Sequence, residues 1–339
     1  MERYTRQSIL SQIGSSGQDK ISAARVAIVG IGALGSVSAQ LCARGGVGFL
    51  RLIDRDVIEQ SNLQRQVLFN EADVKAGLAK ASAAKRHLAE INSEIQIEAV
   101  VEDLHAANID EWLGDVDVVL DGTDNFETRY LLNDFAVKNK IPFIYGGAIE
   151  TRGMVYAVLP DGRPCLRCVF PENPGAEHSQ TCDRSGILAS ASHMTASMQF
   201  TRLIQILTEG SAAIPAELFS FDVWRGEFKQ ISAQSLTGEV CPGCQNGIFP
   251  GLDIQTATQV LKLCGRNAVQ IQREKGHELS WENLSERWKS GAGVQVSADF
   301  ARVTIPDYEL MLFKNGRVIV KGTEDPVLAK SLYARWIGN

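Results

Sequence analysis

A glycine-rich turn between two predicted strands constrains the fold of this chain more than any other feature. Residues 25–29 have the apolar pattern of a buried strand, and the sequence GIGALG follows at residues 30–35. A helical pattern covers residues 36–43, and a second strand pattern covers residues 49–53 and ends at Asp54. Strand, glycine turn, helix, strand and terminal acid within about 30 residues are typical of a nucleotide-binding βαβ unit. The sequence therefore predicts an α/β fold with a Rossmann-like, doubly wound sheet.

Further patterns extend this architecture. They are a helix over residues 79–91 and strands over residues 95–101, 116–120, 142–145 and 154–158. The polar run from Asp121 to Asn125 follows one of these strands, and ligands of open α/β sheets gather at carboxyl ends of strands.

A second domain is expected because 339 residues exceed the usual length of one domain. The Pro- and Gly-rich stretch 241–251 is typical of a linker, so we expect an α/β domain over residues 1–249 and a small α+β module over residues 250–339. The module is expected to begin with a helix from Asp253 to about Leu263, followed by a strand over 268–273 and one helical face with Trp281, Leu284 and Trp288. Strands over 308–313 and 317–320 would flank an Asn315-Gly316 hairpin turn. A last helix would run from Pro326 towards Trp336.

The glycine loop itself predicts phosphate binding. Gly30, Gly32 and Gly35 let backbone amides and a helix N-terminus approach a phosphate, and Asp54 can accept hydrogen bonds from a ribose. Taken alone, the loop fits either a dinucleotide-dependent oxidoreductase or a purely structural tight turn. Hydride transfer needs none of the polar clusters found elsewhere in the chain.

The turn-rich segment after the second strand holds Asp56, Asn62, Arg65 and Gln66, which we include among the candidate nucleotide contacts. The planar fork of Arg65 and the amide of Asn62 suit triphosphate oxygens, although a solvated polar loop has the same composition. Lys80 lies at a predicted helix start, where it is either a phosphate ligand or an exposed lysine.

The strand-end segment 121–129 offers a second set of oxygen ligands. Magnesium prefers carboxylate and phosphate oxygens, so Asp124 is a candidate magnesium ligand and Asn125 a candidate nucleotide contact. A turn rich in Asp and Asn is also a common structural device.

Four of the seven cysteines form two C-x-x-C pairs, Cys165 with Cys168 and Cys241 with Cys244. Each pair can supply two thiolates to one tetrahedral zinc ion, which favours a structural zinc site over free thiols or redox pairs. Because 72 residues separate the pairs, such an ion would join distant segments.

The other three cysteines have different surroundings. Cys42 and Cys264 lie in apolar stretches and are expected in the core. Cys182 lies in a polar stretch near Arg184, which could favour a reactive thiolate, although a single loop cysteine is often incidental.

Charge and hydropathy disfavour several partners. The 34 Lys and Arg against 40 Asp and Glu give a net charge of -6, with no general attraction to nucleic acid or anionic membranes. No stretch approaches the roughly 18 apolar residues of a membrane span, and the polar start MERYTR lacks the core of a signal peptide. We therefore expect a cytoplasmic protein that binds neither nucleic acid nor membrane.

In combination, these motifs resemble the ThiF/MoeB/HesA family, bacterial relatives of ubiquitin-activating enzymes. The resemblance covers residues 1–249 and rests on RYTRQ at 3–7, the glycine loop, NLQRQ at 62–66, TDN at 123–125 and both cysteine pairs. It implies an adenylyltransferase that uses ATP and magnesium to adenylate the C-terminal glycine of a ubiquitin-like sulfur-carrier protein ending in Gly-Gly, with release of pyrophosphate. The carrier would serve thiamine or molybdopterin synthesis, and Cys182 favours thiamine.

The resemblance also implies roles for single residues. Asp54 would hold the ribose and Asp124 the magnesium. Arg6 would reach the phosphates from the partner subunit of a homodimer, and Cys182 matches a position where some members carry a cysteine that attacks the acyl adenylate or joins the carrier through sulfur. The phosphates would be held by Asn62, Arg65 and Lys80. The C-terminal module would be either a stabilising appendage or a dock for the carrier or a sulfur-donor protein.

This residue set suits adenylation. A C-terminal carboxylate is ionised near neutral pH, so its attack on the α-phosphorus needs no general base. Bringing an anion to a polyanion requires positioned cations and magnesium. The alternatives are an NAD-dependent oxidoreductase, supported by the glycine loop and Asp54, and a non-catalytic nucleotide-binding scaffold.

Overall fold

The structure, a computed structural model, describes residues 2–160, 164–171, 185–236, 240–253, 260–263, 267–271, 293–297 and 299–336. The chain forms two compact units. The first comprises Met1–Lys75 and Lys80–Ile254, and the second comprises Ala76–Ala79 and Gln255–Asn339. Each unit has its own hydrophobic core.

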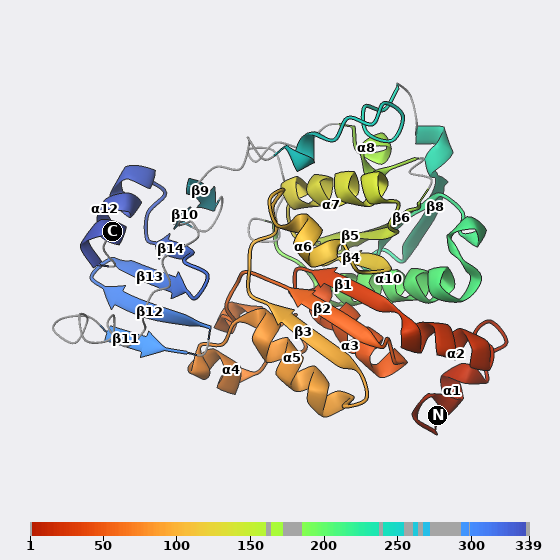
Figure 1. The fold of residues 1–339 in the computed structure, drawn as a ribbon, viewed down its shortest axis with the longest axis horizontal. Helices are drawn as coiled ribbons and strands as arrows, with labels where there is room; N and C mark the ends of the chain where they lie inside the picture. Colours follow the sequence, from red (N-terminus) through yellow and green to blue (C-terminus); the bar gives the residue numbers. More distant parts are fainter. Residues whose placement is uncertain are drawn as a thin grey trace. The chain divides into compact units, whose positions relative to one another are not determined.

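The first unit is built on an eight-stranded sheet with the order β3-β2-β1-β4-β5-β6-β7-β8 (Figure 1). Its strands are β1 (Arg25–Val29), β2 (Phe49–Ile53), β3 (Gln96–Val100), β4 (Val118–Asp121), β5 (Phe143–Ile149), β6 (Arg152–Val158), β7 (Glu217–Asp222) and β8 (Glu227–Ser232). Neighbouring strands from β3 to β5 are parallel, and β6, β7 and β8 join antiparallel. The α/β class is confirmed, with a mixed sheet.

Helices cover both faces of this sheet, which explains why the central strands are continuous apolar runs. Helices α3, α5 and α10 pack along one face, and α6 and α7 enclose a core cluster on the other (Figure 1). Within β1, Ala27 and Val29 belong to the cluster beneath α6 and α7. The helices of this unit are η1 (Glu2–Tyr4), α1 (Thr5–Ser8), α2 (Gly14–Ala23), α3 (Gly35–Gly45), η2 (Gln60–Asn62), α4 (Glu71–Ala76), α5 (Lys80–Ile91), α6 (Ile109–Leu113), α7 (Phe126–Asn139), α8 (Leu166–Val169), α10 (Ala189–Glu209), η3 (Ser211–Ala213), η4 (Ala233–Leu236) and η5 (Pro250–Leu252).

The second unit is a six-stranded sheet with the order β11-β12-β13-β14-β10-β9, in which every neighbouring pair is antiparallel. Helix α12 contributes Leu332, Tyr333 and Trp336 to a core that includes Val303 and Leu310 of the sheet. The elements are β9 (Val260–Leu263), β10 (Ala268–Ile271), β11 (Gly293–Val296), β12 (Phe300–Ile305), β13 (Tyr308–Phe313), β14 (Val318–Lys321) and α12 (Pro326–Trp336).

One prediction for this unit is wrong. Residues 260–263, expected to end a helix that begins at Asp253, form strand β9, which pairs antiparallel with β10 from Leu263 opposite Ala268 to Val260 opposite Ile271. A short apolar run fits a helix or a strand equally well, and here pairing with a neighbouring strand decides it. Residues 254–259 and the expected helical face with Trp281, Leu284 and Trp288 lie outside the described residues.

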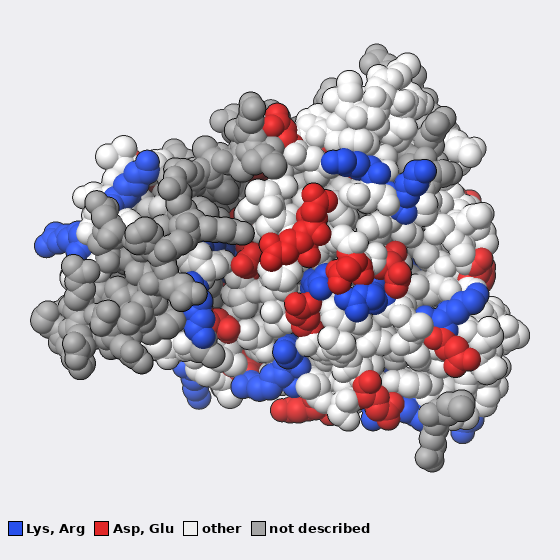
Figure 2. Space-filling model, viewed as in Figure 1, with Lys and Arg blue, Asp and Glu red and all other residues white. Residues whose placement is uncertain are grey.

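The surface carries both signs of charge. On the face shown in Figure 2, Lys and Arg side chains of the first unit are interspersed with Asp and Glu side chains. Ion pairs also involve buried side chains, such as Arg51 with Glu98 at 2.7 Å. Among the helices that the structure describes, none has the length and apolar character needed to cross a bilayer.

Candidate functional site

Three glycines bring the carboxyl ends of β1 and β4 into direct backbone contact. Gly30 follows β1 with a φ of +85°, a conformation that L side chains rarely adopt. A Cβ on Gly35 would lie 1.8 Å from the Gly30 carbonyl oxygen, and a Cβ on Gly122 would lie 2.0 Å from the same oxygen. Packing alone therefore requires glycine at positions 30, 35 and 122.

Gly32 differs from its neighbours in the loop. Its φ is not in the left-handed region, and the nearest atom to a Cβ built on it is Gln66 Nε2 at 3.8 Å. The fold therefore has room for a side chain at Gly32, and the open space beside this glycine could admit the close approach of a ligand. Gln66 is 4% exposed, and its Oε1 has no hydrogen-bond partner in the described part of the chain.

Asp54, at the end of β2, fixes the glycine loop. Its Oδ2 accepts a hydrogen bond from the Ile31 amide at 2.6 Å, and its Oδ1 accepts one from the Asp56 amide at 2.7 Å. Burial raises the pKa of Asp54, and the nearby Lys80 charge opposes that rise. A carboxylate offers about four acceptor positions, so these two bonds leave capacity for a ribose hydroxyl.

Lys80 is buried. It starts α5, is 7% exposed and places Nζ 3.2 Å from Asp56 Oδ2. Its backbone amide also donates to the Asp56 carbonyl at 2.9 Å. The alternative of an exposed helical lysine is therefore wrong, and the ammonium group lies within the polar cluster that begins at Asp54.

Asn62 and Arg65 have local partners. Asn62 is 8% exposed, and its Oδ1 accepts a hydrogen bond from the Glu59 amide at 3.0 Å, which caps η2. Arg65 Nη1 donates to the Ser61 carbonyl at 2.9 Å, and Arg65 is partly exposed. No carboxylate of the described chain lies within ion-pair distance of Arg65, so its positive charge is available to a ligand anion.

A buried ion pair shapes the turn after β4. Asp121 is 1% exposed and accepts hydrogen bonds from the Thr123 amide at 2.8 Å, the Thr123 hydroxyl at 2.6 Å and Arg129 Nε at 3.0 Å. Arg129 Nη2 in turn donates to the Thr123 carbonyl at 2.8 Å. Burial raises the pKa of Asp121, and the positive charge of Arg129 opposes that rise. Sequence reasoning missed this pair, since nothing local distinguishes a buried arginine on a helix.

The turn presents Asp124 at the surface. Asp124 is exposed, whereas Asn125 caps α7 by accepting a hydrogen bond from the Thr128 amide at 2.8 Å. Asn125 Nδ2 also donates to Asp124 Oδ1 at 3.4 Å. Because β1, β2 and β4 are parallel neighbours, the glycine loop, Asp54 and Asp124 share one edge of the sheet. An exposed carboxylate at the same sheet edge as the glycine loop could hold a magnesium ion.

Arg6 lies away from this edge. The preceding Tyr4 packs against Gly46, which follows α3, and its hydroxyl accepts a hydrogen bond from Asn92, which follows α5, at 2.8 Å. Since α3 begins at the glycine loop and rises about 1.5 Å per residue, its two ends lie about 16 Å apart. Arg6, exposed on α1, is therefore at the opposite end of α3 from the glycine loop of its own chain (Figure 1).

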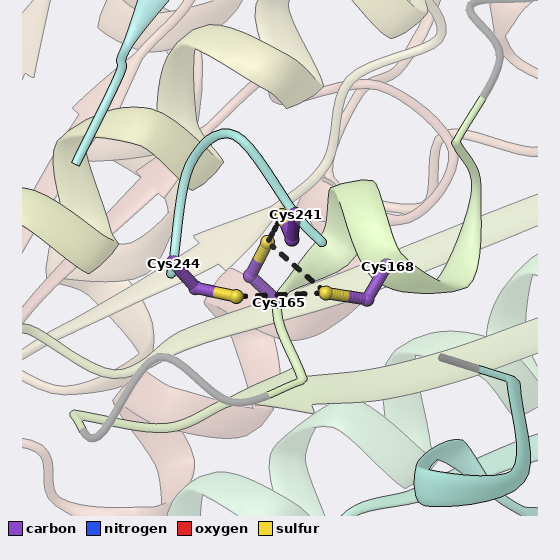
Figure 3. Close-up of side chains that lie close together, drawn as sticks. All are labelled: Cys165, Cys168, Cys241 and Cys244. Carbon is purple, nitrogen blue, oxygen red and sulfur yellow. Dashed lines mark hydrogen bonds between the residues drawn. The ribbon is translucent and has the colours of Figure 1, made fainter. Parts of the chain in front are cut away.

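The two cysteine pairs meet in space (Figure 3). Cys165 Sγ lies 3.9 Å from Cys168 Sγ and 3.6 Å from Cys241 Sγ, and Cys168 Sγ lies 3.5 Å from Cys244 Sγ. All four sulfurs are within 4.8 Å of one another. A tetrahedral ion with metal–sulfur bonds of about 2.3 Å requires sulfurs about 3.8 Å apart, so these four residues can hold a metal.

Hydrogen bonding and burial shift the pKa values of cysteines in this cluster in opposite directions. The hydrogen bond that Cys168 donates lowers the pKa of Cys165 to about 5, and the same bond raises the pKa of Cys168. Burial raises the pKa of Cys244 to about 12. Cys42, by contrast, is fully buried in α3, where burial raises its pKa, as expected for a core residue. Cys182 and Cys264 lie outside the described residues.

The chain matches one protein family and several known proteins. A family model described as the ThiF family matches residues 4–243. The chain is 42% identical over 340 residues to the sulfur carrier protein ThiS adenylyltransferase of Bacillus subtilis, a match that covers 99% of both proteins. It is 35% identical over 247 residues to the SAMP-activating enzyme E1 of Haloferax volcanii, covering 73% of this chain and 90% of that protein. A crystal structure of E. coli MccB with ATP shares the fold, with a TM-score of 0.61 and 24% identity over 72% of this chain and 74% of that one.

The glycine loop generates a paired prediction. Gly35→Ala should lower the stability by about 3 kcal/mol or more, because its Cβ meets backbone. Gly32→Ala should keep the wild-type unfolding midpoint but bind ATP at least about tenfold more weakly, because its methyl group occupies the space of a ligand. Thermal unfolding and ATP titration check both variants. Wild-type ATP affinity in Gly32→Ala would show that the loop does not bind nucleotide.

Proposed function

Since this chain belongs to the ThiF family, we propose that it adenylates the C-terminal carboxylate of a ubiquitin-like sulfur-carrier protein that ends in Gly-Gly. The predicted resemblance to this family is confirmed, and the chain is an adenylyltransferase. The reaction consumes ATP and releases pyrophosphate.

The match to the ThiS adenylyltransferase carries the proposal. It covers 99% of this chain, so it includes the second unit, whereas the match to the SAMP-activating enzyme covers 73% of the chain. A carrier of the ThiS type, in thiamine synthesis, is therefore favoured over a molybdopterin carrier. The second unit would serve that same carrier or a sulfur-donor protein.

The proposed reaction is an in-line displacement at the α-phosphorus. A carboxylate oxygen of the carrier forms a bond to the α-phosphorus as the bond from that phosphorus to the bridging oxygen breaks, and pyrophosphate leaves with the electron pair. No proton moves, so this step needs no general base. The chain's task is to position two anions, and Lys80 and Arg65 supply positive charge for it.

The remaining candidates complete the nucleotide site. Asp54 would accept hydrogen bonds from the ribose hydroxyls in addition to the one from the Ile31 amide. Gln66 Oε1 would accept a hydrogen bond from the ligand. Asp124 would hold a magnesium ion that neutralises the phosphates, with Asn125 beside it. Asp56 would contact the nucleotide and also orient Lys80. Asn62 would contact the phosphates and also hold the turn that carries Arg65.

Arg6 would act in the partner subunit of a homodimer. The support is its position, since α1 lies at the far end of α3 from the glycine loop of the same chain. A second copy could bring its own Arg6 to the phosphates. Cys182 keeps its proposed role as the cysteine that attacks the acyl adenylate or joins the carrier through sulfur.

The metal of the four-cysteine cluster is proposed to be zinc. Four sulfur ligands at tetrahedral spacing are typical of closed, structural zinc sites, which leave no open position for a substrate. When bound, zinc would join the segment after β6 to the segment before η5.

Asp124→Asn should reduce carrier-dependent exchange of pyrophosphate into ATP by a factor of about 100 or more, because an amide holds magnesium poorly. Glu127→Gln is the matched control, since Glu127 is an exposed acid in the first turn of α7 and should be dispensable. Wild-type exchange in Asp124→Asn would remove its proposed metal role. ATP binding without any exchange in the wild type would indicate a scaffold instead of an enzyme.

A mixture of two inactive variants tests the role of Arg6. In a mixed dimer of Arg6→Ala and Lys80→Ala, one site combines an intact Lys80 with an intact Arg6 from the partner. Co-refolding or subunit exchange should therefore restore about a quarter of the wild-type exchange rate. If Arg6 acts in its own chain, both sites of the mixed dimer are defective and no activity returns.

Elemental analysis should find about one zinc ion per chain. Because Cys168 and Cys244 have raised pKa values, both lose a proton when they bind the ion as thiolates, so zinc affinity should rise with pH from about pH 6 to about pH 8. Competition with a chelator measures this. A purified, stably folded protein with no bound metal would contradict the zinc proposal.

A further inference from the structure

We propose that Asp134 is the positioning residue of the metal centre: its buried carboxylate holds both cysteine-bearing segments against α7. This inference rests on the proposed metal binding by the four cysteines. Asp134 lies in the middle of α7, away from the nucleotide contacts at the start of that helix, and is fully buried.

The first segment is held through Arg167, which lies between Cys165 and Cys168. Arg167 Nε donates to Asp134 Oδ1 at 2.8 Å, and Arg167 Nη2 donates to Asp134 Oδ2 at 2.8 Å. This two-bond geometry fixes the direction of the guanidinium as well as its distance. The guanidinium also stacks on the ring of Tyr130, 4.4 Å from the centroid. The backbone between the two cysteines therefore has one orientation relative to α7.

The neighbouring Asn133 adds a third connection to the first segment. Its Oδ1 accepts a hydrogen bond from the Leu166 amide at 2.8 Å, directly after Cys165. Asn133 is fully buried, and its Nδ2 donates to Asp134 Oδ1 at 3.1 Å. Of these two consecutive residues of α7, Asn133 thus holds the main chain of the first segment and Asp134 holds the Arg167 side chain.

The same carboxylate reaches the second segment. The Gly251 amide, which follows the Cys241–Cys244 turn, donates to Asp134 Oδ2 at 2.9 Å. Arg167 Cδ would also lie 3.7 Å from a Cβ on Gly243, between the second pair of cysteines. Asp134 and Arg167 therefore join two segments that are distant in the sequence, since Cys165 and Cys241 are 76 positions apart.

Asp134 has no capacity left to bind the metal itself. Its two oxygens accept four hydrogen bonds, from Asn133, from Arg167 twice and from Gly251. A carboxylate has about four acceptor positions, so all are occupied. Its role is to hold the two cysteine-bearing segments together, so that the ligands lie at the spacing that the ion needs.

Zinc competition against a chromophoric chelator at fixed pH tests this role. Asp134→Asn should bind zinc about 10- to 100-fold more weakly than the wild type, because residues that orient metal ligands typically contribute that much. Asp73→Asn is the matched control: Asp73 is also fully buried and pairs with Arg86 and with His87 at 2.8 Å, but it holds no cysteine segment. Asp73→Asn should keep the wild-type zinc affinity.

Amide hydrogen exchange in the metal-free protein provides a second readout. The Leu166 and Gly251 amides should be protected in the wild type and exchange about tenfold or more faster in Asp134→Asn. If Asp134→Asn does not fold, Arg167→Lys, which keeps the charge and loses the two-bond geometry, should show the same weakening of zinc binding.

The outcomes separate this proposal from the proposed zinc site. Equal zinc affinity of Asp134→Asn and wild type, or equal weakening in Asp134→Asn and Asp73→Asn, overturns the positioning role while the zinc site stands. A wild-type protein that binds no zinc refutes the zinc site, and the positioning role with it.

Discussion

The backbone contact between Gly30, Gly35 and Gly122 is the constraint on which the rest of the first unit depends. It brings the turns after β1 and β4 together at distances where no side chain fits. Asp54 then fixes the loop through the Ile31 amide, and Lys80 approaches through Asp56. This packing does not require a glycine at position 32, and we propose that a ligand approaches there.

The candidate site of this moderately acidic chain holds two cationic side chains, Lys80 and Arg65, among carboxylates. The net charge is -6, yet Lys80 is buried beside Asp56 and Arg65 has no carboxylate partner in the described chain. Burial holds Lys80 in place, because a displaced buried charge loses its partner without gaining water. A fixed arrangement of charge is what a reaction without proton transfer requires from its enzyme, since the barrier lies in bringing two anions together.

Features encoded locally could be predicted from the sequence, and features formed by distant residues could not. Strands β1 and β2, the glycine loop and the C-x-x-C pairs each lie in one short segment, and their predicted positions agree with the structure. The pairs Asp121–Arg129 and Asp134–Arg167 depend on where α7 packs, and periodicity does not report that. The helix predicted from Asp253 to about Leu263 was wrong at residues 260–263, because pairing with β10 determines the structure of that segment.

The most direct test of the account is the intact mass of a ThiS-type carrier after incubation with this protein, ATP and magnesium. The carrier should gain the mass of one adenylyl group on its C-terminal glycine, and a carrier that lacks its last glycine should gain nothing. An unchanged carrier mass, with ATP demonstrably bound to the protein, would contradict adenylation as the function of this site.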